Sequence, residues 1–226
     1  MGFFSTALRI AEKDLKAEFR RAYEVLSILI FSVSSILICS LAWGGALAGR
    51  AEVAAAALWI ILFFASVLTF TTSFTREVDR GTFGGLKTLP CPPSAILLGK
   101  ILYAIVLLFL VELVLLLSSM VFLNLSLSEV FLELLLVFFL GMVNLSVAGS
   151  FVSGLVMFSE GKTLLLSFLL FPICMPVLVP SVLATEKIVK GLSMVNIMPE
   201  LRLLLAFLFS ITAIGALTFK FILEEA

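Results

Sequence analysis

Six apolar runs, each long enough to cross a lipid bilayer, decide what this chain can fold into. A membrane-spanning helix needs about 20 consecutive, mostly apolar residues. Short polar stretches separate the six runs, which cover residues 25–48, 53–74, 96–123, 131–158, 163–184 and 201–223. Hydrophobic residues make up 62% of the chain, well above the roughly 45–50% of a soluble domain. We therefore predict an all-α integral membrane protein with six transmembrane helices.

Residues 1–24 precede the first run and predict an amphipathic helix that lies in the membrane interface. Apolar side chains such as Phe4, Leu8, Leu15 and Phe19 recur at helical spacing, and charged residues occupy the other side. A cleaved signal peptide is the alternative, but the basic segment and the apolar run after it are both too long for one. We expect residues 1–226 to form a single transmembrane domain.

The distribution of basic residues predicts the orientation in the membrane. The side that carries the N-terminus holds eleven of them: Arg9, Lys13, Lys16, Arg20, Arg21, Arg76, Arg80, Lys87, Lys100, Lys162 and Lys220. The other side holds four: Arg50, Lys187, Lys190 and Arg202. Loops rich in lysine and arginine stay in the cytoplasm. Both termini and the polar segment of residues 75–95 are therefore expected to be cytoplasmic, and the loop of residues 185–200 to lie outside.

The polar segment is the most conspicuous interruption of the apolar pattern. Residues 75–95 combine acidic and basic side chains with several glycines and prolines. A simple connection between two membrane helices does not need so much polarity. We interpret the segment as a surface that contacts another component in the cytoplasm.

Two polar side chains fall in the middle of apolar runs. Glu112 is in the third run, where an ionised carboxylate costs about 2.5–3.5 kcal/mol, and Asn144 in the fourth is its natural hydrogen-bond partner. One interpretation is a polar point in a substrate path or at a partner interface. The other is a structural clasp between two helices, and the sequence leaves both open.

Small residues recur on one face of the fourth run. Ser146, Ser150 and Gly154 are each four residues apart, with Gly149 and Ser153 beside them. Such a face lets helix backbones approach closely. We favour packing within the bundle over a seam with a second chain, because the pattern is common in helical membrane proteins.

Three prolines recur every four residues in the fifth run. Pro172, Pro176 and Pro180 remove three backbone donors from one side of the helix. The spacing predicts a kinked or broken helix.

The chain lacks the motifs of a catalytic site. It has no phosphate-binding loop of the G-x-x-x-x-G-K-[ST] type, no HExxH and no GxSxG. It has no histidine, and Cys39, Cys91 and Cys174 are far apart in the sequence. We expect a non-catalytic subunit that binds no metal or other cofactor directly, and any ATP must act through a partner. A net charge of zero predicts no nucleic-acid partner.

Three stretches resemble one known family. They are KDLKAEFRR at residues 13–21, FTREVDRGTF at residues 74–83 with Leu86, Leu89-Pro90 and Leu98-Gly99-Lys100 after it, and FPICMPVL at residues 171–178. With the six runs, they resemble ABC exporter permeases of the type-2 architecture. More narrowly they resemble the CcmB family, haem exporter protein B, the permease of cytochrome c maturation. The chain departs from the family pattern at Gly84-Gly85, which is either a hinge or a loose turn, and at Cys174.

The resemblance implies partners and a docking site. It implies a cytoplasmic ABC ATPase in two copies, a second copy of this chain or other cytochrome c maturation membrane proteins, and the cytoplasmic membrane of a prokaryote as the location. It also implies that the complex handles haem or releases a haem-loaded chaperone when the ATPase works. The ATPase would dock on a single helix from Glu77 to Phe83, and the implied docking residues are Arg76, Glu77, Asp79, Arg80, Gly81, Thr82 and Phe83.

Two other functions fit the same pattern of spans. One is an ABC exporter permease for a lipid, a drug or a polysaccharide, which would usually lack the three spaced prolines. The other is a membrane scaffold that transports nothing. An associated ATPase would separate both transporter functions from the scaffold.

Overall fold

The computed structural model describes residues 2–88, 91–125 and 130–225, and helices make up most of this part of the chain. In chain order they are α1 (Phe3–Phe19), α2 (Ala22–Ala48), α3 (Ala51–Ser73), α4 (Thr75–Asp79), α5 (Phe83–Lys87), α6 (Pro93–Phe122), α7 (Phe131–Val156), α8 (Lys162–Val189), the 3₁₀ helix η1 (Met194–Ile197) and α9 (Met198–Glu225).

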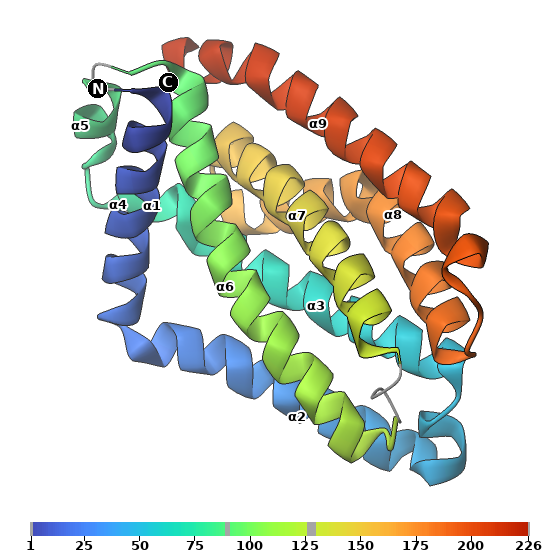
Figure 1. Ribbon diagram of the computed structural model, residues 1–226. Coiled ribbons are helices and arrows are strands. Elements are labelled where there is room, and N and C mark those ends of the chain that lie inside the picture. Colours follow the sequence, from blue (N-terminus) through green and yellow to red (C-terminus); the bar gives the residue numbers. More distant parts are fainter. Residues whose placement is uncertain (1, 89–90, 126–129, 226) are drawn as a thin grey trace.

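Six helical segments in the described residues are long and apolar enough to cross a membrane. They are formed by α2, α3 with α4, α6, α7, α8 and η1 with α9. This finding confirms the predicted all-α membrane architecture. Successive long helices run in opposite directions, so both chain termini lie at the same end of the bundle, together with α1, α4 and α5 (Figure 1).

The central helix of the bundle is α3. Inside the chain, 72% of its most apolar stretch is buried, whereas only 17% is buried for the first and last spans. α3 packs against α2, α6, α7 and α8, while α2 and α9 lie on the outside. The outer helices therefore present most of their apolar surface to lipid or to another membrane protein.

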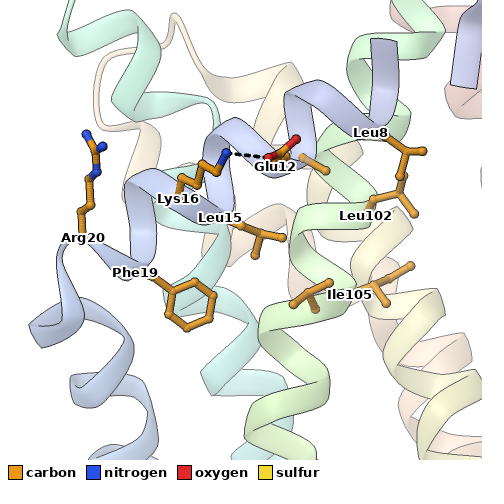
Figure 2. Close-up of a pocket in the computed structure, with 10 residues that line it drawn as sticks. Leu8, Glu12, Leu15, Lys16, Phe19, Arg20, Leu102 and Ile105 are labelled. Atoms are coloured by element: carbon orange, nitrogen blue, oxygen red, sulfur yellow. Dashed lines mark hydrogen bonds and ion pairs between the residues drawn. The ribbon is translucent and has the colours of Figure 1, made fainter. Parts of the chain in front are cut away.

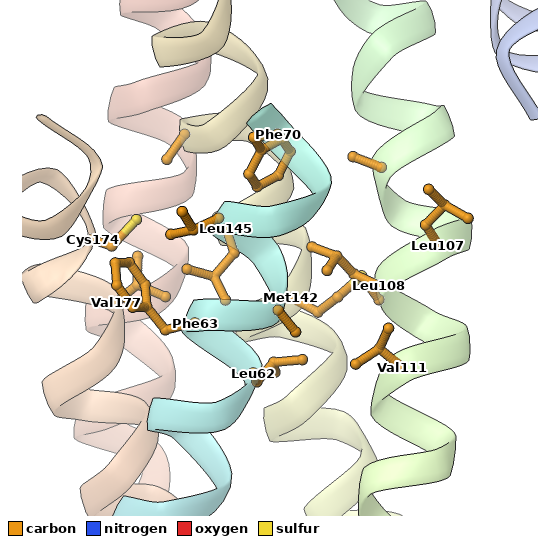
Figure 3. Close-up of a cluster of buried hydrophobic side chains, with 14 of the residues drawn as sticks. Leu62, Phe63, Phe70, Leu107, Leu108, Val111, Met142, Leu145, Cys174 and Val177 are labelled. Atoms are coloured by element: carbon orange, nitrogen blue, oxygen red, sulfur yellow. The ribbon is translucent and has the colours of Figure 1, made fainter. Parts of the chain in front are cut away.

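Aromatic rings of α3 fill hollows on α7 where side chains are missing. A Cβ atom at Gly149 would lie 2.0 Å from the ring of Phe70, and one at Gly141 would lie 2.2 Å from Trp59. Ser153 on α7 donates a hydrogen bond to the carbonyl oxygen of Phe70 at 3.0 Å. Phe70 points into the apolar layer between α3, α7 and α8 (Figure 3). The small residues of the fourth run therefore serve packing within the bundle, as expected.

The helix with three prolines continues without a break. α8 is helical from Lys162 to Val189, through Pro172, Pro176 and Pro180. The predicted break is wrong, because each missing N–H removes a single bond while the surrounding turns keep theirs. The predicted kink at the three prolines stays a prediction. α8 also extends five residues beyond the predicted end at residue 184. Its last turns are held by packing, since Ile188 is buried and Thr185 accepts a hydrogen bond from Trp59 at 2.8 Å.

The start of α6 differs from the expected boundary, and α2 contains an interruption that the sequence did not predict. α6 begins at Pro93 rather than at residue 96, because proline is favoured in a first helical turn, where its missing N–H is not needed. In α2 the helical geometry is interrupted at Gly44, whose φ of +67° favours glycine.

We predict that Gly149→Ala destabilises the protein by about 1–3 kcal/mol, because the added methyl group overpacks the contact with Phe70. The matched control is Gly215→Ala, since a Cβ atom there would meet its nearest neighbour at an ordinary 3.4 Å. The measurement is the thermal unfolding midpoint of the full chain in mild detergent. Equal midpoints for the two variants would contradict the tight fit between α3 and α7.

Candidate functional site

The polar segment forms two short helices separated by a turn. α4 ends at Asp79, and α5 begins at Phe83. Between them Gly81 has a φ of +66°, a left-handed conformation that strains any residue with a side chain. The expected single helix from Glu77 to Phe83 is therefore wrong. Gly84-Gly85 does not mark the break, because both residues lie within α5; residues 89 and 90 lie outside the described part.

The seven implied docking residues lie on two different faces. Asp79, Arg80, Gly81 and Thr82 are exposed at the turn, and Asp79 forms an ion pair with Lys162 at the start of α8. The other three, Arg76, Glu77 and Phe83, face the bundle: the Arg76 side chain is only 15% exposed, and Glu77 and Phe83 are buried. Of the seven implied docking residues, the four at the turn are therefore the ones exposed for contact with another protein.

A buried lysine lies at the centre of the inward-facing group. Lys100, in the second turn of α6, is 1% exposed. Its ammonium group lies 2.9 Å from an oxygen of Asp14 on α1 and 3.3 Å from one of Glu77 on α4. It also donates a hydrogen bond to the carbonyl oxygen of Ser73 at 3.1 Å, and lies 5.0 Å from the ring centre of Phe74. One cation thereby joins α1, the α3–α4 junction and α6.

A partly buried arginine forms a second set of contacts nearby. Arg76 on α4 lies 2.7 Å from an oxygen of Glu18 on α1, and it also pairs with Glu24 at the start of α2. Tyr103 on α6 donates a hydrogen bond to the same oxygen of Glu18 at 2.9 Å. These contacts bring α2 into the group and tie α1 to α6 a second time.

Lys13 completes what we call the ion cluster: Lys13, Asp14, Glu18, Glu24, Arg76, Glu77, Lys100 and Tyr103. Lys13 pairs with both Asp14 and Glu77. Burial by itself lowers the pKa of Lys13, but the two carboxylates outweigh that effect and raise its pKa above the ordinary lysine value. A buried charge is costly unless it is paired and hydrogen-bonded. Because the cations and acids come from different helices, the cluster fixes those helices relative to one another.

The family resemblance implied a docking role for Arg76 and Glu77 but did not indicate the residues that pair with them. Asp14 and Glu18 are four residues apart, which places two carboxylates on one face of α1. Lys100 enters an otherwise apolar helix and needs an acid nearby. These two patterns could have indicated the cluster, although neither shows which acid meets which cation.

Glu112 and Asn144 do not form the predicted hydrogen bond. Both side chains are fully buried. The amide nitrogen of Asn144 donates to the carbonyl oxygens of Leu140 at 2.9 Å and Leu204 at 3.3 Å. Neither carboxyl oxygen of Glu112 has a hydrogen-bond partner among the described residues. The side chain of Asn144 instead donates to carbonyl oxygens on its own helix α7 and on α9. The interpretation of Glu112 and Asn144 as a clasp between α6 and α7 is therefore wrong.

Comparison with known proteins decides the family. The model of the CcmB family, described as CcmB protein, matches residues 5–224, nearly the whole chain. The chain belongs to the CcmB family. A search of curated proteins finds no match. Family membership makes this chain a multi-pass membrane protein and the permease subunit of a haem-exporter ABC complex in cytochrome c maturation. In this member of the family, the ion cluster and the exposed turn of the polar segment lie side by side at the end of the bundle that carries both termini.

We predict that Lys100→Met destabilises the protein by about 3–5 kcal/mol, because it leaves Asp14 and Glu77 without their most buried cation. Adding Asp14→Asn and Glu77→Gln should recover part of the loss, since the carboxylate charges are then removed as well. The measurement is the thermal midpoint in detergent. Lys162→Met is the control, because its partner Asp79 is exposed and such pairs contribute about 0–1 kcal/mol. A triple variant no more stable than Lys100→Met would show that charge pairing does not hold the cluster.

We also predict that Glu112→Leu raises the thermal midpoint, because it removes an unpartnered polar group worth about 1–3 kcal/mol when buried. Leu115→Ala, at a fully buried apolar position one turn away, should lower the midpoint and serves as the comparison. A lower midpoint for Glu112→Leu would show that the carboxyl group is bound by something in the folded protein.

Proposed function

We propose that this CcmB-family permease receives the movement of a partner ABC ATPase at the exposed turn of its polar segment and passes it to the membrane helices through the ion cluster. The ATPase hydrolyses ATP, and this chain supplies no catalytic residue. The energy of ATP hydrolysis is used to deliver haem, or to release a haem-loaded chaperone, in cytochrome c maturation. The complex handles the haem, and this chain need not bind it directly.

The docking surface in this proposal is the turn around Arg80 and Thr82. These residues are exposed, whereas Arg76 and Glu77 point into the bundle and are occupied by internal ion pairs. Docking therefore uses the turn, and the other implied residues act as its internal support. The pair of Asp79 with Lys162 connects the turn to the start of α8, which gives a second route into the bundle.

The observation that carries the proposal is the position of Lys100. It bridges Glu77 on α4 and Asp14 on α1 while belonging to α6. A displacement of α4 must either move α6 with it or separate buried opposite charges, which is costly. The ion cluster thus makes α1, α4 and α6 respond together, as movements of packed helices do in other switching proteins.

The proposed orientation of the protein in the membrane follows from the distribution of its basic residues. Eleven of the 15 basic residues belong to the side that carries both termini and the polar segment. By the positive-inside rule this side faces the cytoplasm, where the ATPase has access to ATP. We propose a prokaryotic cytoplasmic membrane as the location, two ATPase copies, and a second copy of this chain or other maturation membrane proteins as neighbours.

The docking step is tested with Arg80→Glu in the full complex. Reversing the charge of an exposed contact residue should weaken ATPase association by about 2 kcal/mol, roughly thirtyfold in affinity. The control is Arg50→Glu, an exposed arginine at the opposite end of the bundle. The readout is co-purification of the ATPase in mild detergent. Normal co-purification with Arg80→Glu would contradict docking at the turn.

The transmission step is tested with Glu77→Gln, which keeps the shape of the side chain and weakens its pairs with Lys13 and Lys100. We expect the ATPase to co-purify normally, while ATP hydrolysis no longer responds to the permease and covalent attachment of haem to cytochrome c falls. The control is Glu52→Gln, whose partner Lys190 is exposed at the other end of the bundle. Full haem attachment with Glu77→Gln would contradict transmission through the cluster.

A further inference from the structure

α1 has three faces, although its sequence pattern indicated two. One face is buried against the bundle and includes Ala7, Ile10 and Ala11. α1 comes very close to α6 there, since a Cβ atom at Gly99 would lie 2.8 Å from Ile10. A second face is charged. The third is apolar and exposed, with Leu8 60% and Phe19 52% exposed. In a membrane protein, an exposed apolar face beside a span needs an apolar neighbour.

The third face forms one wall of an apolar hollow. The hollow has a volume of about 690 Å³ and lies between α1 and α6, lined by Leu8, Leu15 and Phe19 on one side and by Leu102, Ile105 and Val106 on the other. Leu15 and Phe19 extend from α1 on the side away from the Lys16–Glu12 pair (Figure 2). On α6, positions 102, 105, 106 and 109 recur at helical spacing, so a partly or fully exposed apolar stripe leads from the hollow along the span.

The charged face of α1 is basic because the ion cluster uses its acids. Asp14 and Glu18 turn inward to Lys100 and Arg76. The exposed charged residues on α1 and its C-cap are Arg9, Glu12, Lys13, Lys16 and Arg20, of which Lys13 also belongs to the ion cluster. Four of these five are cations, and they line a second hollow of about 510 Å³.

The apolar and basic hollows meet at three side chains. Glu12, Lys16 and Arg20 line both of them. Lys16 pairs with Glu12, whereas the guanidinium group of Arg20 makes no ion pair with a described residue. Arg20 points away from Phe19 and from the apolar side of α1 (Figure 2). An apolar stripe along a span thus ends below a basic surface that still has an uncompensated cation.

We propose that this junction binds one anionic phospholipid of the surrounding membrane. An acyl chain lies along Leu102, Ile105 and Val106 beneath α1, and the headgroup phosphate contacts Arg20 with support from Lys16. Arginine and lysine near a membrane surface attract anionic headgroups, and amphipathic helices bury their apolar face at the headgroup boundary. The positive charge of Lys16 and Arg20 at the rim of the hollow selects the anionic headgroup, and the apolar hollow holds the acyl chain. The bound lipid is separate from any cargo of the permease and does not depend on the proposed coupling to an ATPase.

The test is native mass spectrometry of the full chain purified in mild detergent. Phosphatidylglycerol or phosphatidylcholine with identical acyl chains is added, and the lipid retained per protein is measured. We expect phosphatidylglycerol to be retained about fivefold better, the value of one additional basic contact near the membrane surface. Equal retention of the two lipids by the unmodified protein would overturn the proposal.

Two pairs of variants separate the roles of the rim and the hollow. Lys16→Gln with Arg20→Gln should abolish the preference for phosphatidylglycerol, whereas Arg50→Gln with Arg202→Gln, exposed arginines at the other end of the bundle, should retain it. Val106→Trp should fill the hollow and reduce retention of both lipids severalfold, whereas Val121→Trp, an exposed position near the other end of α6, should not.

Three results would overturn the proposal. The first is a preference for phosphatidylglycerol that survives Lys16→Gln with Arg20→Gln. The second is retention that is equal in Val106→Trp and Val121→Trp. The third is crosslinking of position 106 to a protein helix in the assembled complex with no lipid retained, which would assign the hollow to a protein partner.

Discussion

The burial of Lys100 is the constraint on which the arrangement at this end of the bundle depends. A lysine in the second turn of an apolar membrane helix needs carboxylates close by, and none is available on its own helix within reach. Asp14 and Glu77 supply them from α1 and α4. The cation therefore determines where α1 lies and how the polar segment folds back on the bundle. Arg76 and Tyr103, which share Glu18, reinforce the same arrangement.

The rest of the bundle is held by shape rather than by charge. Trp59 and Phe70 of the central helix α3 occupy space that Gly141 and Gly149 of α7 leave open. Close packing of this kind gives a rigid interior that transmits displacement instead of absorbing it. The charged end and the apolar interior thus complement one another. A movement that enters at α4 meets buried ion pairs first and tightly packed helices next, as the proposed coupling requires.

The sequence predicted the number and approximate limits of the spans because each depends on local composition and length. The family likeness in three short stretches was also correct, since the family model covers residues 5–224. Predictions that required two distant side chains to meet were less successful. Glu112 and Asn144 do not bond to each other. Glu77 faces inward although Asp79 and Arg80 in the same segment are exposed, because one of the cations that pair with it, Lys100, is 23 positions further along the chain.

By itself the sequence determined the class of the protein, its six spans and its family, because hydropathy and short motifs are properties of contiguous residues. Only the tertiary structure decided which acids neutralise which cations. It divided α1 into a buried face, an apolar face and a basic face. It also showed that the break in the polar segment is at Gly81 and not at Gly84-Gly85. Each of these features depends on helices that are distant in sequence and adjacent in space. There, buried charges must be paired and aromatic rings must pack without overlap.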